Sequence, residues 1–315
     1  MASFPVIDFA PFSSPTSTSL ERHAVAINLD EACRNSGFFY LKGHGVPQDM
    51  LDTIRSRAID FFRTASDSEK QSLALKPGDN ARGYVKHDDP DKGSHEALDF
   101  YRPVEDCCEP FGIGQGINQW PTKPDDFLSV VEAYTDQMEA LGKTVIEALA
   151  LALGVDTKLF LSRVDKPFWQ LRMVCYPGQT SVVRTKAGIG EHTDYGILTF
   201  LLTDATKRSL QVQGIDGEWV YADPIEGCFL CNIGDMLAEW TRGTYKSTAH
   251  RVVHTSNSPR VSIPFFFDPN WDAYIEPVLP PADGILDDKH VGVRYRDKYI
   301  EAIEQPLGNT AAFPA

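Results

Sequence analysis

The stretch GEHTDYG, residues 190 to 196, places His192 and Asp194 two positions apart. Alternate residues of a β-strand point to one face, so a strand through this stretch would aim both side chains into one cavity. Imidazole and carboxylate groups are common ligands of divalent metals, whereas a hydrogen-bonded pair at a strand end is the alternative. The same strand is expected to continue in apolar residues: Leu198, Phe200 and Leu202.

A third ligand has two candidates, His250 and His254 in the segment STAHRVVHT. They are four positions apart and share a face if that strand is unbroken. Two histidines and one carboxylate match the facial triad of non-haem Fe(II) oxygenases, which leaves three coordination positions open for chemistry. Zinc accepts the same ligand types, but its coordination shell is usually complete with four ligands.

The pattern His-x-Asp occurs a second time, in the segment KHDDPDKG with His87, Asp88 and Asp89. Proline and glycine close to this copy predict a surface loop, in which the charges are solvated. The pattern alone therefore does not identify a metal site. The strand context of the first copy makes the difference.

Arg260 and Ser262 follow in RVSIPFFF, again two positions apart on one strand face. A guanidinium binds both oxygens of a carboxylate in a charge-assisted, bidentate way, and a hydroxyl adds a further donor. Together with three phenylalanines after them, these residues predict a buried anion site. Arg172 also lies in an apolar strand, QLRMVCY, where an unpaired charge is costly, so it is expected to bind an anion or a carboxylate side chain.

The elements that position these residues begin with a short strand in FPVIDFAPF and an amphipathic helix over residues 20 to 36, which Gly37 ends. A strand follows in FFYLKGHGV, and Pro47 opens a helix of about four turns. Apolar residues recur at three and four positions from 124 to 153, which predicts one long helix facing the core.

Residues 76 to 123 are rich in glycine, proline and aspartate and predict long loops with short strands. Beyond residue 168 the chain alternates short strands and turns, which is typical of a sandwich or barrel. A helix is expected over 288 to 305. The fold class is therefore α+β with a β-sandwich centre, in a single domain.

Composition narrows the class of function. The 315 residues are 42% hydrophobic with a net charge of −14, which disfavours binding to nucleic acid. No segment approaches the roughly 20 apolar residues of a membrane span, and the N-terminus lacks a secretory signal, so a cytoplasmic protein is expected. The cysteines are expected to be free thiols: Cys33, Cys107, Cys108, Cys175, Cys228 and Cys231.

The order and spacing of these segments resemble the Fe(II)- and 2-oxoglutarate-dependent dioxygenases of the isopenicillin N synthase-like group. The likeness covers nearly the whole chain. It rests on FPVIDFAPF, GFFYLKGHGV, EHTDYGILTFLL, LQVQ, GEWVYADP, CNIGDMLAEWTRGTYKSTAHRVV and RVSIPFFFDPN. The resemblance implies a double-stranded β-helix, or jelly roll, with an N-terminal region over 1 to 120, a catalytic core over 165 to 272 and a closing helix.

The resemblance also implies roles for individual residues. Iron would be held by His192, Asp194 and His250, which leaves His254 as a supporting residue. The co-substrate 2-oxoglutarate would be held by Arg260, Ser262 and Tyr176, the tyrosine of VCYPG. Plant members carry an asparagine where this chain has Val174. Substrate contacts are expected from a small set: Arg82, Tyr84, Arg172 and Phe266.

The implied reaction uses Fe(II), 2-oxoglutarate and O2, with ascorbate as an optional reductant, and releases succinate and CO2. It ends in hydroxylation, desaturation or ring closure of a small molecule, such as a compound of secondary metabolism. No separate acid or base is required. Two alternatives stay open here: an iron oxidase of this fold that does not use 2-oxoglutarate, and a binding module that has lost its metal.

Overall fold

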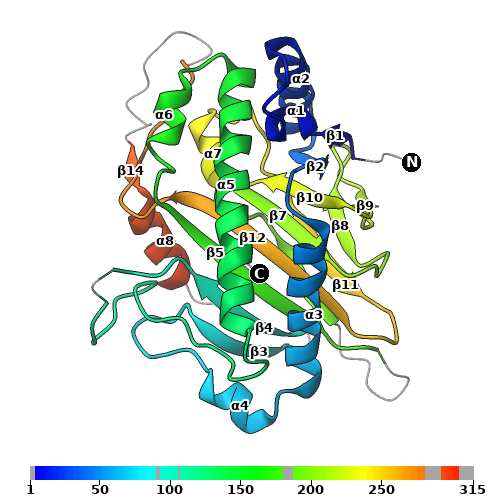
Figure 1. Cartoon of the computed structure of the whole chain (residues 1–315), viewed down its shortest axis with the longest axis vertical. Coiled ribbons are helices and arrows are strands. Elements are labelled where there is room, and N and C mark those ends of the chain that lie inside the picture. Colours follow the sequence, from blue (N-terminus) through cyan, green and yellow to red (C-terminus); the bar gives the residue numbers. More distant parts are fainter. Residues whose placement is uncertain (1–3, 90–92, 106, 180–186, 281–291, 305–315) are drawn as a thin grey trace.

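The computed structural model describes residues 4–89, 93–105, 107–179, 187–280 and 292–304. Figure 1 shows a curved β-sheet at the centre, with long helices across one of its faces. None of the helices in these segments combines the length and apolar composition that a bilayer crossing requires.

The central sheet has twelve strands among the described residues, in the order β1-β2-β10-β7-β12-β5-β4-β6-β11-β8-β9, with β3 beside β4. One side of the jelly roll consists of β1, β2, β10, β7, β12, β5, β4 and β3. The other side consists of β6, β11, β8 and β9. The strands are β1 (Val6–Asp8), β2 (Phe38–Lys42), β3 (Gly83–Asp89), β4 (Gly93–Tyr101), β5 (Pro167–Tyr176), β6 (Ala187–His192), β7 (Leu198–Thr203), β8 (Leu210–Gln213), β9 (Trp219–Tyr221), β10 (Cys228–Ile233), β11 (His250–His254) and β12 (Arg260–Asn270). A separate two-stranded sheet pairs β13 (Tyr274–Ile275) with β14 (Val293–Arg294).

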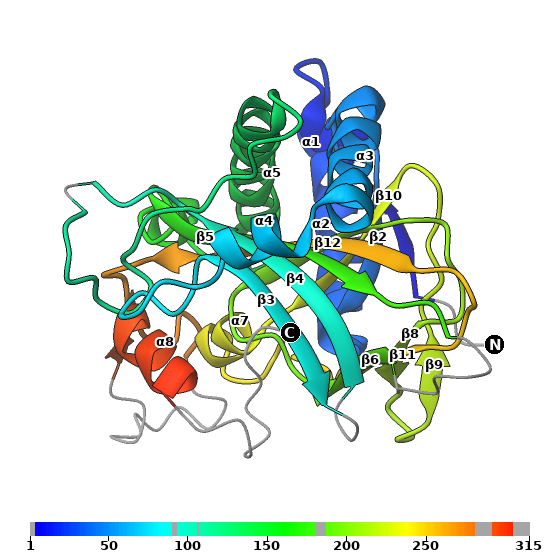
Figure 2. The ribbon, with the colours of Figure 1, turned by 90° about the horizontal axis from the view of Figure 1, so that it is seen from below.

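The helices lie outside this sheet. They are α1 (Ala10–Ser13), α2 (Ser19–Asn35), α3 (Gln48–Thr64), α4 (Asp67–Ser72), α5 (Phe127–Leu153), α6 (Thr157–Leu161), α7 (Asp235–Trp240) and α8 (Tyr295–Glu304). Helices α3 and α5 stand on one side of the strands, and α7 and α8 lie on the other side (Figure 2). The main apolar core joins α2, α3 and α5 to the sheet and extends to α7 and α8.

Local sequence explains where the first helices begin and end. Thr18 caps α2, and its side chain and that of Glu21 form a reciprocal capping box. Gly37 follows the helix with a φ of +67°, and a Cβ there would lie 1.9 Å from the carbonyl oxygen of Lys246. Only glycine fits such an approach. The predicted helices up to residue 153 are therefore confirmed, with shifts of up to three residues at their ends.

The expectation for residues 76 to 123 was partly wrong. This region contributes two long paired strands, β3 and β4, in register from Gly83 opposite Asp99 to Asp89 opposite Gly93. His87 and Asp88 therefore lie in a strand, and the ring of His87 packs 4.7 Å from that of His95. Pairing with β4 overrides the local turn signals. No metal cluster forms around His87 within the described residues.

Two other predictions concern the ends of the chain and the cysteines. The closing helix, α8, begins only at Tyr295, so the predicted helix was wrong for residues 292 to 294, where Val293–Arg294 instead pair as β14. Positions 288 to 291 and 305 of the predicted helix lie outside the described residues. All six cysteines are free, as expected, and Cys231 is buried in β10. Cys228 and Cys231 form a Cys-x-x-Cys pattern, and both belong to the apolar strand β10.

Candidate metal centre

Three side chains converge inside the jelly roll. His192 ends β6, Asp194 follows two residues later, and His250 begins β11 directly opposite His192 in the strand register. One ligand atom from each lies within 4.8 Å of the other two, and all three residues are buried. Asp194 Oδ1 is 3.9 Å from His192 Nε2 and 3.5 Å from His250 Nε2. This is the only group of three potential ligands among the described residues.

The strand around His192 differs from the expectation in one respect. It ends at His192, and β7 resumes only at Leu198, so the alternation of faces is reset by the intervening turn. Leu198, Phe200 and Leu202 pack into the main core, away from the metal site. The residues of β7 that line the site are Thr199 and Leu201. The expectation that Leu198, Phe200 and Leu202 continue the face of His192 and Asp194 was therefore wrong.

Asp194 is fixed by two neighbours that the sequence analysis missed. Thr199 Oγ1 and Asn232 Nδ2 both donate to Asp194 Oδ2, the latter over 2.6 Å. These bonds occupy Oδ2 and leave Oδ1 on the side of the histidines. The available signal was an asparagine at the end of the apolar strand CFLCNI, since a buried amide needs a polar partner.

Backbone carbonyl groups orient the two histidine rings. His192 Nδ1 lies 2.8 Å from the carbonyl oxygen of Gly190, and His250 Nδ1 lies 3.2 Å from that of Thr248. A carbonyl only accepts, so each Nδ1 carries a proton, and the neutral form of each ring presents a lone pair on Nε2. Such support from a backbone carbonyl is the usual arrangement behind metal-bound histidines.

The charges of the three side chains suit a divalent cation. Burial, followed by repulsion from His250, lowers the pKa of His192 to about 4, so this ring is neutral at pH 7. Burial alone would raise the pKa of Asp194, but His250, His192 and Asn232 together hold it well below its usual range. Burial likewise lowers the pKa of His250, and the Asp194 carboxylate more than offsets this and raises it.

Replacing Asn232 with leucine, which has a similar volume, is expected to weaken Fe(II) binding about 10- to 100-fold, the usual effect of removing a support behind a metal ligand. The carboxylate loses one of its two donors and gains freedom to rotate. Titration of the metal-free protein with Fe(II) under anaerobic conditions measures the dissociation constant. An unchanged constant would show that Asn232 does not position Asp194.

The predicted anion-binding residues lie beside this site. Arg260 and Ser262 on β12 and Tyr176 on β5 line the same cavity as the three metal ligands, and Arg260 pairs with Tyr176 in register. Arg260 is 2% exposed, and its guanidinium lies 5.0 Å from the centre of the Tyr176 ring. Its Nε and Nη1 have no hydrogen-bond partner among the described residues. A buried cation with free donors fits a carboxylate ligand.

His254 does not join the metal ligands. Its Nδ1 lies 3.2 Å from Ser209 Oγ, and its Nε2 lies 2.8 Å from the carbonyl oxygen of Ser258. Both ring nitrogens are thereby occupied. His250, and not His254, is thus the histidine that groups with His192 and Asp194.

The four expected substrate residues fall into two groups. Phe266 lines the site cavity, and Arg172 lies on the same face of β5 as Val174 and Tyr176, which also line it. The charge of Arg172 is close enough to lower the pKa of His192, although it is the smallest of the contributions. Arg172 Nε lies 3.4 Å from Asp99 Oδ1, the carboxylate side chain that its burial requires.

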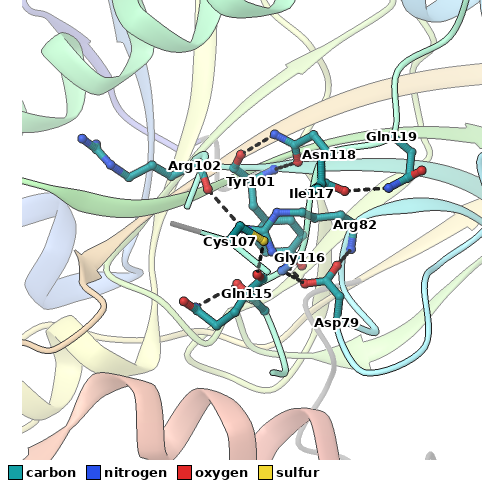
Figure 3. A network of polar contacts seen from close by, with 11 residues as sticks. Asp79, Arg82, Tyr101, Arg102, Cys107, Gln115, Gly116, Ile117, Asn118 and Gln119 are labelled. Atoms are coloured by element: carbon teal, nitrogen blue, oxygen red, sulfur yellow. Dashed lines mark hydrogen bonds and ion pairs between the residues drawn. The ribbon is translucent and has the colours of Figure 1, made fainter. Parts of the chain in front are cut away.

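The other two residues lie elsewhere. Arg82 is fully buried, with Nη1 2.8 Å from Asp79 Oδ1 and Nη2 donating to the carbonyl oxygen of Arg102 over 3.0 Å (Figure 3). Asp79 also accepts from the backbone N–H of Gly116, so this network ties a loop to β3. Tyr84 donates to Glu96 Oε2 and packs in the main core. The structure thus gives Arg82 and Tyr84 structural roles, because Asp79, the backbone carbonyl of Arg102 and Glu96 accept their hydrogen bonds.

A larger cavity, of about 730 Å³, lies on the other side of Arg260. It is bordered by α3 and the loops around residues 203 to 207 and 222 to 230. It shares Leu201, Leu210 and Arg260 with the metal-site cavity but contains none of the three metal ligands. The chemistry therefore belongs to the smaller cavity, which holds the only cluster of potential ligands in the described part of the chain.

Comparison with known proteins agrees with this geometry. Residues 168–269 match the model of the 2OG-Fe(II) oxygenase superfamily, and residues 4–123 match the N-terminal region of the non-haem dioxygenase in morphine synthesis. A homoarginine-6-hydroxylase of Glycine max is 37% identical over 294 residues, which are 88% of either chain. The validamycin A dioxygenase of Streptomyces hygroscopicus subsp. limoneus is 30% identical over 90% of this chain and 81% of its own.

Solved structures show the same relationship. A full-length protein of Neurospora crassa, solved in complex with alpha-KG and thymine, superposes with a TM-score of 0.83 and 28% sequence identity. The superposition covers 95% of this chain and 96% of that one. The double-stranded β-helix expected from the resemblance is therefore confirmed.

Proposed function

The chain belongs to the 2OG-Fe(II) oxygenase superfamily, and from this premise we propose that His192, Asp194 and His250 hold its catalytic iron. The protein is an oxidoreductase, an Fe(II)- and 2-oxoglutarate-dependent dioxygenase. The convergence of three buried ligand atoms within 4.8 Å is the observation that carries the proposal. Each imidazole directs its Nε2 toward Asp194, and the low pKa of Asp194 keeps its carboxylate charged.

Arg260, Ser262 and Tyr176 are the proposed contacts of 2-oxoglutarate. The support is the guanidinium of Arg260, buried beside the metal site with two unused nitrogens among the described residues. A carboxylate can accept from that fork and from the Ser262 hydroxyl at once. Val174, where plant members carry asparagine, is also buried and lines the same cavity, so it offers shape but no hydrogen bond.

Bound iron and 2-oxoglutarate supply the oxidising power that breaks a substrate C–H bond, with release of succinate and CO2. The chain's own residues position the reactants and exclude water. The two histidines and Asp194 would hold the metal and leave coordination positions open for the reactants, as a facial triad does. Phe266 lines the same cavity as the three candidate ligands, and Arg172 lies on the face of β5 that carries Val174 and Tyr176, so we propose both as substrate-orienting residues.

The proposed substrate is a small molecule. The name of one relative indicates hydroxylation of homoarginine, and the Neurospora crassa protein was solved with thymine, so both act on or bind small polar compounds. The validamycin A dioxygenase supports a role in secondary metabolism, and the six free cysteines support a cytoplasmic location, where thiols stay reduced. Hydroxylation is the favoured outcome because the most similar of these relatives is named a hydroxylase.

The test is an aerobic assay of the Fe(II) protein with 2-oxoglutarate. We expect succinate and CO2 to form in equal amounts, to depend on added Fe(II), and to increase with a suitable substrate from a panel that includes thymine and L-homoarginine. Oxygen consumption without succinate formation would instead identify an oxidase that does not use 2-oxoglutarate. Failure to bind Fe(II) at all would identify a metal-free binding module.

A further inference from the structure

The candidate ligand Asp194 lies in a short turn between β6 and β7, and the start of α7 supports the backbone of this turn. The backbone N–H of Asp235 donates to the carbonyl oxygen of Asp194 over 2.8 Å. The next residue, Met236, donates through its backbone N–H to the carbonyl oxygen of Gly196 over 3.0 Å. The position of the Asp194 side chain therefore depends on what holds the turn, in addition to the two donors to its Oδ2.

Asp268 of β12 contacts the same turn. It is 6% exposed, and a Cβ at Gly196 would lie only 1.6 Å from Asp268 Oδ1. The carboxyl group therefore lies directly against the backbone of Gly196, and only glycine admits such an approach. The strand register agrees, because Phe267 of β12 pairs with Leu198 at the start of β7. The Asp268 carboxyl group thus limits the movement of the turn toward β12.

Tyr295, the first residue of α8, fixes the carboxyl group of Asp268. The Tyr295 hydroxyl donates to Asp268 Oδ2 over 2.7 Å, and the tyrosine is fully buried. Its backbone N–H donates to the carbonyl oxygen of Ala273 over 2.9 Å. The Tyr295 ring also lies 6.1 Å from the ring of Tyr195, the residue that follows Asp194. Helix α8 therefore meets the turn at two points.

A polar side chain suits this task better than an apolar one. The hydrophobic effect has no preferred direction, whereas a hydrogen bond weakens steeply when its angle is poor. The three residues before Asp268 in β12, Phe265 to Phe267, are buried and apolar. A buried carboxyl group at the next position costs free energy, and its bond to Tyr295 gives it a fixed orientation in return.

Small movements of the turn matter for a metal ion. A functional site must hold its groups within about 0.5 Å of the productive geometry. Thr199 and Asn232 hold Oδ2 of Asp194, whereas α7 and Asp268 support the backbone that carries it. Loss of a support behind a metal ligand typically weakens metal binding about 10- to 100-fold.

We propose that Asp268 and Tyr295 are positioning residues for Asp194, and that the closing helix α8 thereby sets how tightly the chain holds Fe(II). The path runs from the Tyr295 hydroxyl through the Asp268 carboxyl group to the backbone of Gly196. This inference rests on the proposed function, because it assumes that the iron lies at His192, Asp194 and His250.

Tyr295→Phe tests the path, since it removes one hydroxyl and keeps the ring. The dissociation constant of Fe(II), measured by anaerobic titration of the metal-free protein, is expected to rise about tenfold or more. Tyr84→Phe is the matched control, because Tyr84 also donates to a carboxylate, Glu96 Oε2, over 2.7 Å, outside the metal-site cavity. Both variants should lose similar thermal stability, and only Tyr295→Phe should bind Fe(II) more weakly. Equal weakening in Tyr84→Phe would reduce the effect to general stability and overturn the proposal.

Two substitutions at Asp268 separate position from charge. Asp268→Leu removes the acceptor of the Tyr295 bond and should weaken Fe(II) binding as much as Tyr295→Phe does. Asp268→Asn keeps an acceptor and the shape but removes the charge, so Fe(II) binding should stay within about threefold of the wild type. If Asp268→Asn were as weak as Asp268→Leu, the carboxylate would act through its charge on the cation, and the positioning role would be refuted.

The wild type offers a test that needs no variant. If α8 strengthens Fe(II) binding, Fe(II) must stabilise the docking of α8 by the same factor, because coupling between two sites is reciprocal. Hydrogen–deuterium exchange of α8 under anaerobic conditions should therefore slow by up to about tenfold when Fe(II) is added. Helix α4 is the internal control and should exchange at an unchanged rate.

The inference is overturned if Tyr295→Phe binds Fe(II) as tightly as the wild type, or if Fe(II) leaves the exchange of α8 unchanged. The exchange measurement decides even if a variant does not fold. A wild type that binds no Fe(II) would refute the proposed function together with this inference. A wild type that binds Fe(II) and forms succinate, with a Tyr295→Phe variant of equal affinity, would refute only the positioning role.

Discussion

Replacing His192 with alanine is expected to abolish Fe(II) binding and to reduce succinate formation to the background without enzyme. The substitution removes one of three ligands, and Asp194 and His250 alone leave the cation without its third protein donor. The fold should survive, since within the described residues the one hydrogen bond of the His192 side chain is to the carbonyl oxygen of Gly190. Iron content of the purified protein, succinate release and circular dichroism measure the three effects.

His254→Ala is the matched control for this prediction. It also removes a buried histidine near the site, but one whose ring nitrogens already meet Ser209 and Ser258. We expect reduced thermal stability with iron binding retained. Loss of iron in His254→Ala together with normal iron content in His192→Ala would reverse the ligand assignment.

Replacing Arg260 with methionine should separate function from stability. Loss of two charge-assisted hydrogen bonds removes about 3 kcal/mol or more of binding free energy, so the dissociation constant of 2-oxoglutarate should rise roughly 100-fold or more. The ligand-free protein should be as stable as the wild type or more stable. The reason is that Arg260 is a buried cation whose Nε and Nη1 have no partner among the described residues.

Thermal unfolding with and without 2-oxoglutarate measures both effects in the Arg260→Met protein. The wild type should be stabilised by the co-substrate, and the variant should not be. Arg251→Met is the control, since Arg251 donates to Gln211 and stacks on Trp219 outside the metal-site cavity. A variant at position 260 that binds 2-oxoglutarate normally would contradict the assigned carboxylate site.

Strand alternation and residue type were sufficient to nominate His192 and Asp194 as candidate metal ligands, but they left His250 and His254 as alternatives for the third. His192 and Asp194 are two apart, and the partner strand supplies His250 through long-range pairing that the resemblance identified. The side of β7 that faces the site was not predictable in the same way. The turn after Asp194 resets the alternation, and its shape depends on the close approach of Gly196 to Asp268.

Residues that act through others were harder to find. Thr199 and Asn232 position Asp194 from two different strands, and only the folded sheet brings them together. Arg82 was expected at the substrate, but the structure pairs it with Asp79, three positions earlier in the chain. The partner of Arg172, by contrast, is 73 positions earlier, at Asp99 on the neighbouring strand. A carboxylate that is distant in sequence cannot be assigned to a buried arginine without the sheet register.

The most direct test of the iron and co-substrate sites together is an anaerobic titration of the Fe(II) protein with 2-oxoglutarate, followed by visible absorption. Our assignment predicts a charge-transfer band that saturates at one 2-oxoglutarate per iron, and that is absent in His192→Ala and greatly weakened in Arg260→Met. No band in the iron-loaded wild type, or an undiminished band in both variants, would contradict it.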